Sequence, residues 1–159
     1  MFEVKILTAY PSMFPGSLAL SLTGTALSKK IWSLDIIDLH DFGIDRRKSI
    51  DDEPYGGGPG MVIKPEVVEK AVLSIELKEN ITRKLIYLTP SGKPLKQKNL
   101  EHFITFDQII ILCGRFEGVD QRVINALNFE EISIGDYILS GGEAASQVLV
   151  EGCIRLLPG

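Results

Sequence analysis

Four glycine-containing segments carry the residue types best suited to binding a ligand and doing chemistry in this chain. Glycine has no Cβ, so its backbone N–H and C=O groups can approach a ligand that another side chain would obstruct. We therefore expect a site in which the backbone makes many of the contacts. The segments are DDEPYGGGPGM (Asp51 to Met61), YLTPSGKPL (Tyr87 to Leu95), CGRFEGVDQRV (Cys113 to Val123) and SIGDYILSGGE (Ser133 to Glu143).

Several common catalytic and binding motifs are missing from these segments. No GxGxxG follows the first expected strand and no GxxxxGK[ST] occurs, so a dinucleotide fingerprint and a P-loop are not supported. A nucleophile elbow, GxSxG, would need glycine where Ile138 stands, which disfavours serine hydrolysis. Cys113 and Cys153 form no CxxC, and His40 and His102 lie far apart, so neither a disulfide framework nor a metal site is indicated. We expect buried thiols.

Strands and helices that alternate along the chain must position the four segments. The clearest helix is Lys64 to Leu77, because its apolar residues fall on one face and Pro65 suits a first turn. Leu18 to Lys30 is expected to be helical only in part, since Gly24 interrupts it. The expected strands are Phe2 to Ala9, Trp32 to Leu39, Arg83 to Leu88, Gln108 to Leu112 and Glu131 to Ile134; the other helices are Asp120 to Leu127 and Glu143 to Leu156, the last with Ala144, Ala145, Val148 and Leu149 toward the core.

This alternation predicts an α/β fold with a mainly parallel sheet and helices on both faces. The loops PSGKPL, CGRFEG and GDYILSGGE each follow an expected strand. Because ligands in open α/β folds bind at the carboxyl ends of strands, the three loops predict one composite pocket. Their glycine content alone would equally suit ordinary tight turns.

Composition restricts the class of protein. The 159 residues, 45% of them hydrophobic, fit one domain. No apolar run reaches the length of a membrane span, and the N-terminus lacks the pattern of a secretory signal, so we expect a cytoplasmic protein. The net charge of −4 argues against a broadly cationic nucleic-acid surface, which leaves local clusters as candidate contacts. These are Arg46, Arg47 and Lys48, then Lys93, Lys96 and Lys98, then Arg115 and Arg122.

The four segments, read together and in this order, resemble the bacterial tRNA (guanine-N1)-methyltransferase family of the SPOUT superfamily. The resemblance runs from the N-terminus to Pro158. It implies an α/β domain with a C-terminal trefoil knot, which composition could not have suggested. It also implies that S-adenosylmethionine methylates N1 of the guanosine just 3′ of the tRNA anticodon. The family works as a homodimer in which each active site is built from both chains.

The resemblance also implies which residues bind the cofactor. Thr89 stands where serine is common and keeps a hydroxyl, whereas Phe116 stands where tyrosine is common and loses one. By similarity, Tyr87, Leu88, Thr89 and Pro90 border the pocket, Gly114, Ile134, Gly135, Asp136, Tyr137, Ile138 and Leu139 line it, and Gly141 and Gly142 shape its floor.

The glycine-rich segment PYGGGPG resembles the part of the family that lies beside the target guanine. A chain almost without side chains can lie against a flipped base or against the reactive end of the cofactor. The alternative is a structural turn that caps the helix near Lys64. The implied substrate-binding residues are Tyr55, Gly56, Gly57, Gly58, Pro59 and Gly60.

Methylation at N1 needs a general base, because this nitrogen carries a proton at neutral pH, and a cation or donor to stabilise charge on O6. In the family an arginine near the end of the domain assists, and Arg155 matches it. The family's base is an aspartate in a following linker, and a C-terminal tRNA-binding domain comes after that. The chain stops at Gly159, before both, so we expect cofactor binding with little turnover.

The remaining carboxylates have open roles. By family position, Glu117 lies near the methionine end of the cofactor, where it could take part in proton transfer or coordinate Mg²⁺. A salt bridge to Arg115 or Arg122 is the structural alternative. Asp51 and Asp52 are weaker candidates because adjacent acidic loop residues are usually solvated, and Asp136 could order the cofactor loop.

Three functions are compatible with these observations. The first is the cofactor-binding, dimerising domain of a tRNA methyltransferase. The second is a stand-alone module that binds cofactor or a partner chain without catalysis. The third, an unrelated phosphate or nucleotide binder, requires the four motif matches to be accidental.

Overall fold

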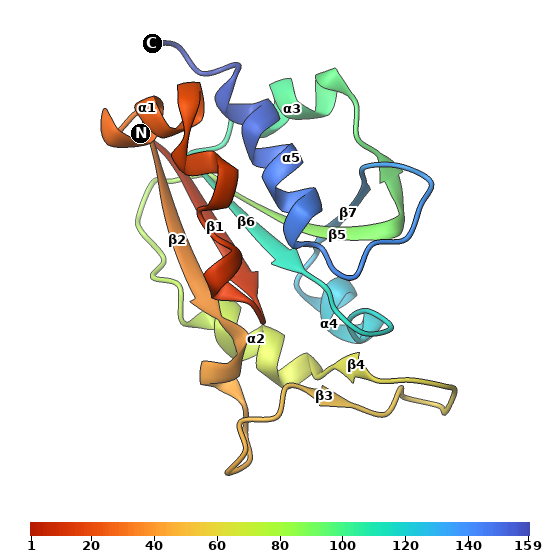
Figure 1. The fold of residues 1–159 in the computed structure, drawn as a ribbon. Helices are drawn as coiled ribbons and strands as arrows, with labels where there is room; N and C mark the ends of the chain where they lie inside the picture. Colours follow the sequence, from red (N-terminus) through yellow and green to blue (C-terminus); the bar gives the residue numbers. More distant parts are fainter.

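A five-stranded parallel sheet forms the centre of the molecule. The computed structural model describes residues 1–159, and the strand order is β2-β1-β6-β5-β7 (Figure 1). All four strand pairings are parallel, which confirms the predicted mainly parallel α/β architecture. The strands are β1 (Phe2–Thr8), β2 (Trp32–Asp38), β5 (Arg83–Pro94), β6 (Gln108–Cys113) and β7 (Glu130–Ser133).

Helices cover both faces of this sheet (Figure 1). The central strand β6 is fully buried and alternates: Ile109 and Ile111 pack in one apolar cluster, and Ile110 and Leu112 pack in the other. The first cluster includes side chains from α1 (Ser21–Ser28), α3 (Gln97–Phe103) and α5 (Glu143–Ile154), and the second includes side chains from α2 (Pro65–Leu73) and α4 (Gln121–Ala126).

The helices differ from the sequence prediction in several places. Gly24 lies inside α1 and does not interrupt it; a Cβ there would stand 2.1 Å from the carbonyl oxygen of Ala19, so the preceding turn packs where a side chain would be. The predicted helix from Lys64 ends early, at Leu73, and the helix α3 was not predicted. In α5, Leu149 and Ala145 are buried as expected, but Ala144 and Val148 are exposed, so their predicted burial was wrong.

Strand β5 is longer than the expected Arg83 to Leu88. It runs on to Pro94, through residues predicted as a loop, with an irregularity between Leu88 and Lys93. Both Leu88 and Lys93 pair with Ile132 of β7, so the intervening residues arch over that strand. A Cβ on Gly92 would lie 2.5 Å from the backbone nitrogen of Ile132, which explains a glycine at this crossing.

The glycine-rich segment forms an arm that extends from the body of the molecule (Figure 1). Its base is a short antiparallel pair, β3 (Asp51–Asp52) with β4 (Val62–Ile63). The amide of Ile63 donates to the carbonyl of Gly118 at 3.0 Å, and the amide of Glu117 donates to the carbonyl of Met61 at 2.9 Å. The base of the arm is therefore tied to the loop after β6.

Candidate functional site

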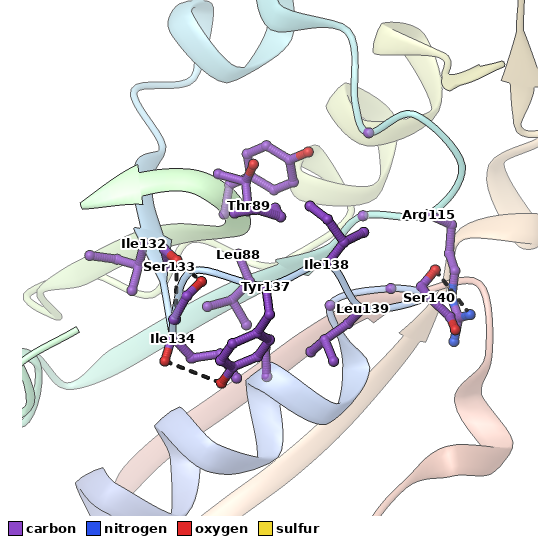
Figure 2. Close-up of a pocket in the computed structure, with 18 of the residues that line it drawn as sticks. Leu88, Thr89, Arg115, Ile132, Ser133, Ile134, Tyr137, Ile138, Leu139 and Ser140 are labelled. Carbon is purple, nitrogen blue, oxygen red and sulfur yellow. Dashed lines mark hydrogen bonds between the residues drawn. The ribbon is translucent and has the colours of Figure 1, made fainter. Parts of the chain in front are cut away.

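A cavity of about 220 Å³ lies where the loops after β5, β6 and β7 meet. Its walls come from three separate parts of the chain: Tyr87–Pro90, Gly114–Gly118 and the long connection from β7 to α5. Figure 2 shows Leu88 and Thr89 facing the side chains of Ile134, Tyr137, Ile138 and Leu139 across this space. The loops thus meet at the carboxyl ends of parallel strands, as their order in the sequence predicted.

The structure gathers most of the residues that the sequence placed at a cofactor pocket. Asp136 is the exception, since it is exposed on the β7–α5 loop and does not line the cavity. The predicted residues that line it are Tyr87, Leu88, Thr89, Pro90, Gly114, Ile134, Gly135, Tyr137, Ile138, Leu139, Gly141 and Gly142, together with Glu117. What this cavity binds stays a prediction at this point.

Sequence reasoning missed part of the lining. Arg115 entered the prediction only as a cationic residue and as a possible partner of Glu117, although it borders the cavity. Each missed residue is in one of the four quoted segments or within two residues of its end, so closeness to those segments was the available signal. The others are Phe116, Gly118, Ile132, Ser133, Ser140 and Ala145.

Two of the loops are joined directly by their backbones. The amide of Gly142 donates to the carbonyl of Gly114 at 3.0 Å, and Arg115 pairs with Gly141 as an isolated antiparallel bridge. A Cβ on Gly142 would lie 3.0 Å from the Cα of Cys113. Glycine at 142 therefore permits the close approach that brings the two walls together.

Tyr87 connects the wall formed by Tyr87–Pro90 to the wall formed by Gly114–Gly118. Its hydroxyl accepts a hydrogen bond from the amide of Val119 at 3.2 Å, and its side chain is almost fully buried. Burial raises the pKa of the phenol above its usual value, so the hydroxyl stays neutral at physiological pH. A Cβ on Gly114 or Gly118 would lie 3.1 or 3.0 Å from this hydroxyl oxygen. The phenol thus shapes the loop between β6 and α4.

Glu117 presents an exposed carboxylate at the cavity without an ion-pair partner. The two arginines considered as partners pair elsewhere: Arg115 lies 3.0 Å from Glu143, and Arg122 lies 2.7 Å from Asp120. The structural alternative for Glu117, a salt bridge to either arginine, is therefore not what the structure shows. Its carboxylate is available to a ligand.

The glycine-rich arm meets the cavity at Glu117. A Cβ on Gly60 would lie 2.3 Å from the Cγ of Glu117, so the arm backbone passes directly beside this side chain. Farther out, the guanidinium of Arg122 stacks on the ring of Tyr55 at 4.2 Å. Gly56, Gly57 and Gly58 have no heavy atom near the position of a Cβ. The arm contacts the rest of the molecule at its base and through Tyr55. The space around Gly56, Gly57 and Gly58 is open.

Arg155 is not brought to this cavity. It is exposed at the end of α5, which begins beside the cavity at Glu143 and is about 18 Å long at the usual rise per residue. The residues that follow, Leu157 and Pro158, lie beside Met1 and Phe2, at the opposite end of the sheet. Within one chain, Arg155 and Glu117 are therefore far apart.

The other residues considered in the sequence are placed as follows. Cys113 and Cys153 are buried free thiols, and burial raises the pKa of Cys153 to about 12. His40 has an acidic partner that the sequence analysis missed, since its Nδ1 lies 2.9 Å from Asp38. No group of three or more His, Cys, Asp or Glu side chains could hold a metal ion. None of the helices combines the length and apolar character needed to span a bilayer.

Comparison with known proteins places these observations in a family. Residues 2–159 match the family model described as tRNA (Guanine-1)-methyltransferase TrmD. The chain is similar to a tRNA (guanine-N(1)-)-methyltransferase of Ehrlichia ruminantium (strain Gardel), with 54% identity over 159 residues, which is 100% of this chain and 67% of the relative.

Proteins with the same name in two other bacteria are similar over almost the whole chain. The one from Wolbachia pipientis subsp. Culex pipiens is 52% identical over 99% of this chain and 68% of its own length, and the one from Rhizobium etli is 48% identical over 99% and 67%. The chain thus spans about two thirds of the length of these curated relatives. It belongs to the tRNA (guanine-N1)-methyltransferase (TrmD) family of enzymes.

Proposed function

We propose that this chain binds S-adenosylmethionine in the cavity and serves methyl transfer to N1 of the guanosine just 3′ of the tRNA anticodon, in the cytoplasm. The observation that carries the proposal is the convergence of three family motifs on one cavity. These motifs are far apart in sequence. Two of their loops, those after β6 and β7, are joined by the backbone hydrogen bond from Gly142 to Gly114. Residues 1–159 would form the cofactor-binding domain.

The lining fits such a cofactor. Leu88, Ile138 and Leu139 offer apolar surface to an adenine ring, and the glycines at 114 and 118 leave backbone groups open to it. The carboxylate of Glu117 has no cationic partner, so it can face the positively charged end of the ligand. When bound, S-adenosylmethionine supplies a methyl group made reactive by its sulfonium.

The residues of this chain then have distinct roles in the chemistry. N1 of guanine must lose its proton, and Glu117 is the only carboxylate that lines the cavity. We assign proton transfer to it within this chain. The arm from Tyr55 to Gly60 would lie against the target guanine, because Gly60 adjoins Glu117 and the glycines before it leave room for a base.

Arg155 would act on the cavity of a second copy of the chain. Its distance from Glu117 within one chain agrees with an active site built from two chains, in which the arginine stabilises charge on O6. Exposed apolar side chains support such a homodimer: Leu20, Leu22 and Val148 are each more than half exposed, and the elements that carry them are packed together.

The C-terminal trefoil knot that the family resemblance implies is compatible with the strand pairing. Strand β7 pairs with both limbs of the arch from Leu88 to Lys93.

The residues at the cavity do not suit Mg²⁺. Glu117 is a lone carboxylate, and no cluster of donors surrounds it. No step of the proposed reaction passes through a metal ion.

Turnover by a polypeptide limited to residues 1–159 is expected to be slow. None of these residues matches the family's linker aspartate, and the net charge of −4 gives little attraction for RNA. The test uses tritiated S-adenosylmethionine and a tRNA transcript with guanosine or adenosine 3′ of the anticodon. We expect cofactor to be retained by the protein, with only slow methylation that requires the guanosine.

The possible outcomes separate the candidate functions. Retention of the cofactor with no methylation at all would favour a binding or dimerising module, the second function considered above. Failure to retain the cofactor would contradict the proposal. Methylation at a rate typical of enzymes would show that Glu117, or another residue of this chain, is a sufficient base.

A further inference from the structure

A buried ionic network lies behind the loop from Ile134 to Gly142, and the chemistry proposed above does not use it. The side chain of Glu143, at the start of α5, is completely buried. Its Oε1 accepts a hydrogen bond from the hydroxyl of Thr8 at 2.8 Å, and its Oε2 lies 3.0 Å from Nη2 of Arg115. The hydroxyl of Thr8 in turn accepts from the amide of Tyr10 at 2.9 Å. The network joins β1, the loop after β6 and α5.

Arg115 extends the network to the cavity wall. Its Nη1 donates to the carbonyl of Ser140 at 3.3 Å, and its guanidinium stacks on the ring of Tyr10 at 4.2 Å. Figure 2 shows the guanidinium beside Ser140, at the edge of the lining residues. The other nitrogen, Nη2, donates to the sulfur of Met13 at 3.4 Å. Arg115 thus borders the cavity, while the ion pair and hydrogen bonds of its guanidinium are made to the protein.

Gly141 makes room for the ion pair. A Cβ at this position would lie 2.3 Å from Nε of Arg115 and 2.5 Å from Oε2 of Glu143, so the pair packs where a side chain would stand. Nε of Arg115 and Oε2 of Glu143 are buried and have no partner with hydrogen-bond geometry, so the close approach of the charges is an ion pair only. Such incompletely satisfied buried charges do not in general stabilise a fold beyond what apolar residues would. A role in shaping the site explains them better.

We propose that Thr8, Arg115 and Glu143 are positioning residues that hold the loop from Ile134 to Gly142 in the shape that binds the ligand. They would act through the loop backbone, at Ser140 and Gly141, without touching the ligand. This inference rests on the proposed cofactor site for its effect on affinity. Its effect on the loop does not depend on what the cavity binds.

The first test compares Arg115→Ala with Arg83→Ala, a half-buried arginine that binds the carbonyl of Glu76 away from the cavity. We expect Arg115→Ala to weaken binding of S-adenosylhomocysteine about tenfold or more, because a charge-assisted contact to the loop is lost, and Arg83→Ala to leave it unchanged. Millimolar methylguanidinium should restore part of the affinity of Arg115→Ala only. Equal affinity in wild type and a folded Arg115→Ala protein would overturn the proposal.

A milder variant keeps the proposal testable if Arg115→Ala does not fold. Thr8→Val removes only the hydroxyl that binds Glu143, and Thr8→Ser keeps it. We expect Thr8→Val to weaken binding and Thr8→Ser to retain it. The opposite order, or no difference between the two, would contradict a role for this hydroxyl in positioning the loop.

Hydrogen exchange separates this proposal from the proposed function. The amide of Gly142 donates a hydrogen bond to the carbonyl of Gly114. Its exchange rate therefore reports whether the loop after β6 and the loop after β7 stay joined. We expect Arg115→Ala and Thr8→Val to speed this exchange in the absence of any ligand. If wild type binds no S-adenosylhomocysteine but the exchange rises, only the cofactor proposal fails; if the exchange is unchanged, the positioning role is wrong.

Discussion

Single side chains at the site shape the loops by filling space beside glycines and by hydrogen bonding to the loop backbone. Tyr87 is the clearest case, because its phenol occupies the space beneath Gly114 and Gly118 and accepts the amide of Val119. The loop between β6 and α4 therefore takes its shape from one side chain that belongs to another strand. The same residue borders the cavity, so we expect a change at Tyr87 to affect both the stability of the fold and ligand binding.

The Tyr87→Phe variant should lower the free energy of unfolding by about 1–3 kcal/mol, because the buried amide of Val119 loses its only hydrogen-bond acceptor. Tyr137→Phe is the matched control. Its hydroxyl makes one long, exposed bond to the carbonyl of Ile134, at 3.3 Å, so we expect a change within about 0.5 kcal/mol. Urea unfolding measures both, and equal effects would refute this account of Tyr87.

A substitution at Gly92 tests how closely the backbone of β5 passes that of β7. Gly92→Ala should cost about 1–3 kcal/mol, because its Cβ meets the backbone of Ile132, which cannot move without breaking strand pairing. Ser91→Ala changes the neighbouring exposed residue and should stay within about 0.5 kcal/mol. A Gly92→Ala protein as stable as Ser91→Ala would mean that the two strands are not packed as closely as described.

At this scale the sequence predicted which residues meet but not how their charges pair. The motif loops indicated the lining from Tyr87 to Gly142, whereas the partner of Arg115 was not predicted, because Glu143 is distant along the chain and its burial cannot be read from a motif. The distance of Arg155 from the cavity was equally hidden. It follows from the direction in which α5 runs, and no pattern of residues encodes that direction.

At the scale of elements, helix α4 contacts the glycine-rich arm through one side chain, that of Arg122. Asp120 caps α4 by accepting the amide of Arg122, and it also holds the guanidinium of Arg122 through both carboxylate oxygens, at 3.0 and 2.7 Å. That guanidinium stacks on Tyr55 of the arm. One carboxylate thus orients the cation that positions the arm.

The Asp120–Arg122 pair gives a prediction for pH dependence. The hydrogen-bonded side chain of Arg122 lowers the pKa of the Asp120 carboxyl. A lowered pKa in the folded state means that the charge stabilises the fold above the unfolded pKa of about 3.9 and stops doing so as the pH falls through the folded value.

Asp120→Asn keeps an oxygen to cap the helix but loses the charge. Wild type should therefore be more stable than Asp120→Asn by a constant amount from about pH 8 to about pH 5, with the difference closing below about pH 4. Urea unfolding at several pH values measures this. A difference that widens as the pH falls would contradict the pairing.

Element boundaries show where sequence patterns were insufficient. Gly24 is compatible with the helix α1 because the neighbouring turn fills the space of its side chain, which is a tertiary contact. Helix α3 was missed because its seven residues, QKNLEHF, are mostly polar and bury only Leu100 and Phe103. The order of strands along the chain, by contrast, could be predicted because β1, β6 and the first half of β5 are rich in aliphatic residues.

At the scale of the whole molecule, the proposed homodimer rests on the distance of Arg155 from the cavity and on exposed apolar side chains. Val148→Glu changes a side chain that is 52% exposed, so it should leave the fold of one chain intact. We expect it to convert a dimer, with twice the 17.5 kDa mass of one chain, into a monomer. Lys98→Glu, on the exposed side of α3, is the control, and sedimentation equilibrium measures the mass.

The ligand of the cavity decides the function proposed for this chain. Isothermal titration of the protein with S-adenosylhomocysteine, with NADH and ATP as controls, tests this most directly. We predict saturable binding of S-adenosylhomocysteine alone, because the three motif loops line the cavity proposed for the methyl donor and the sequence has no phosphate-binding P-loop motif. No binding of S-adenosylhomocysteine, or equal binding of ATP, would contradict the assignment of this cavity as the methyl-donor site.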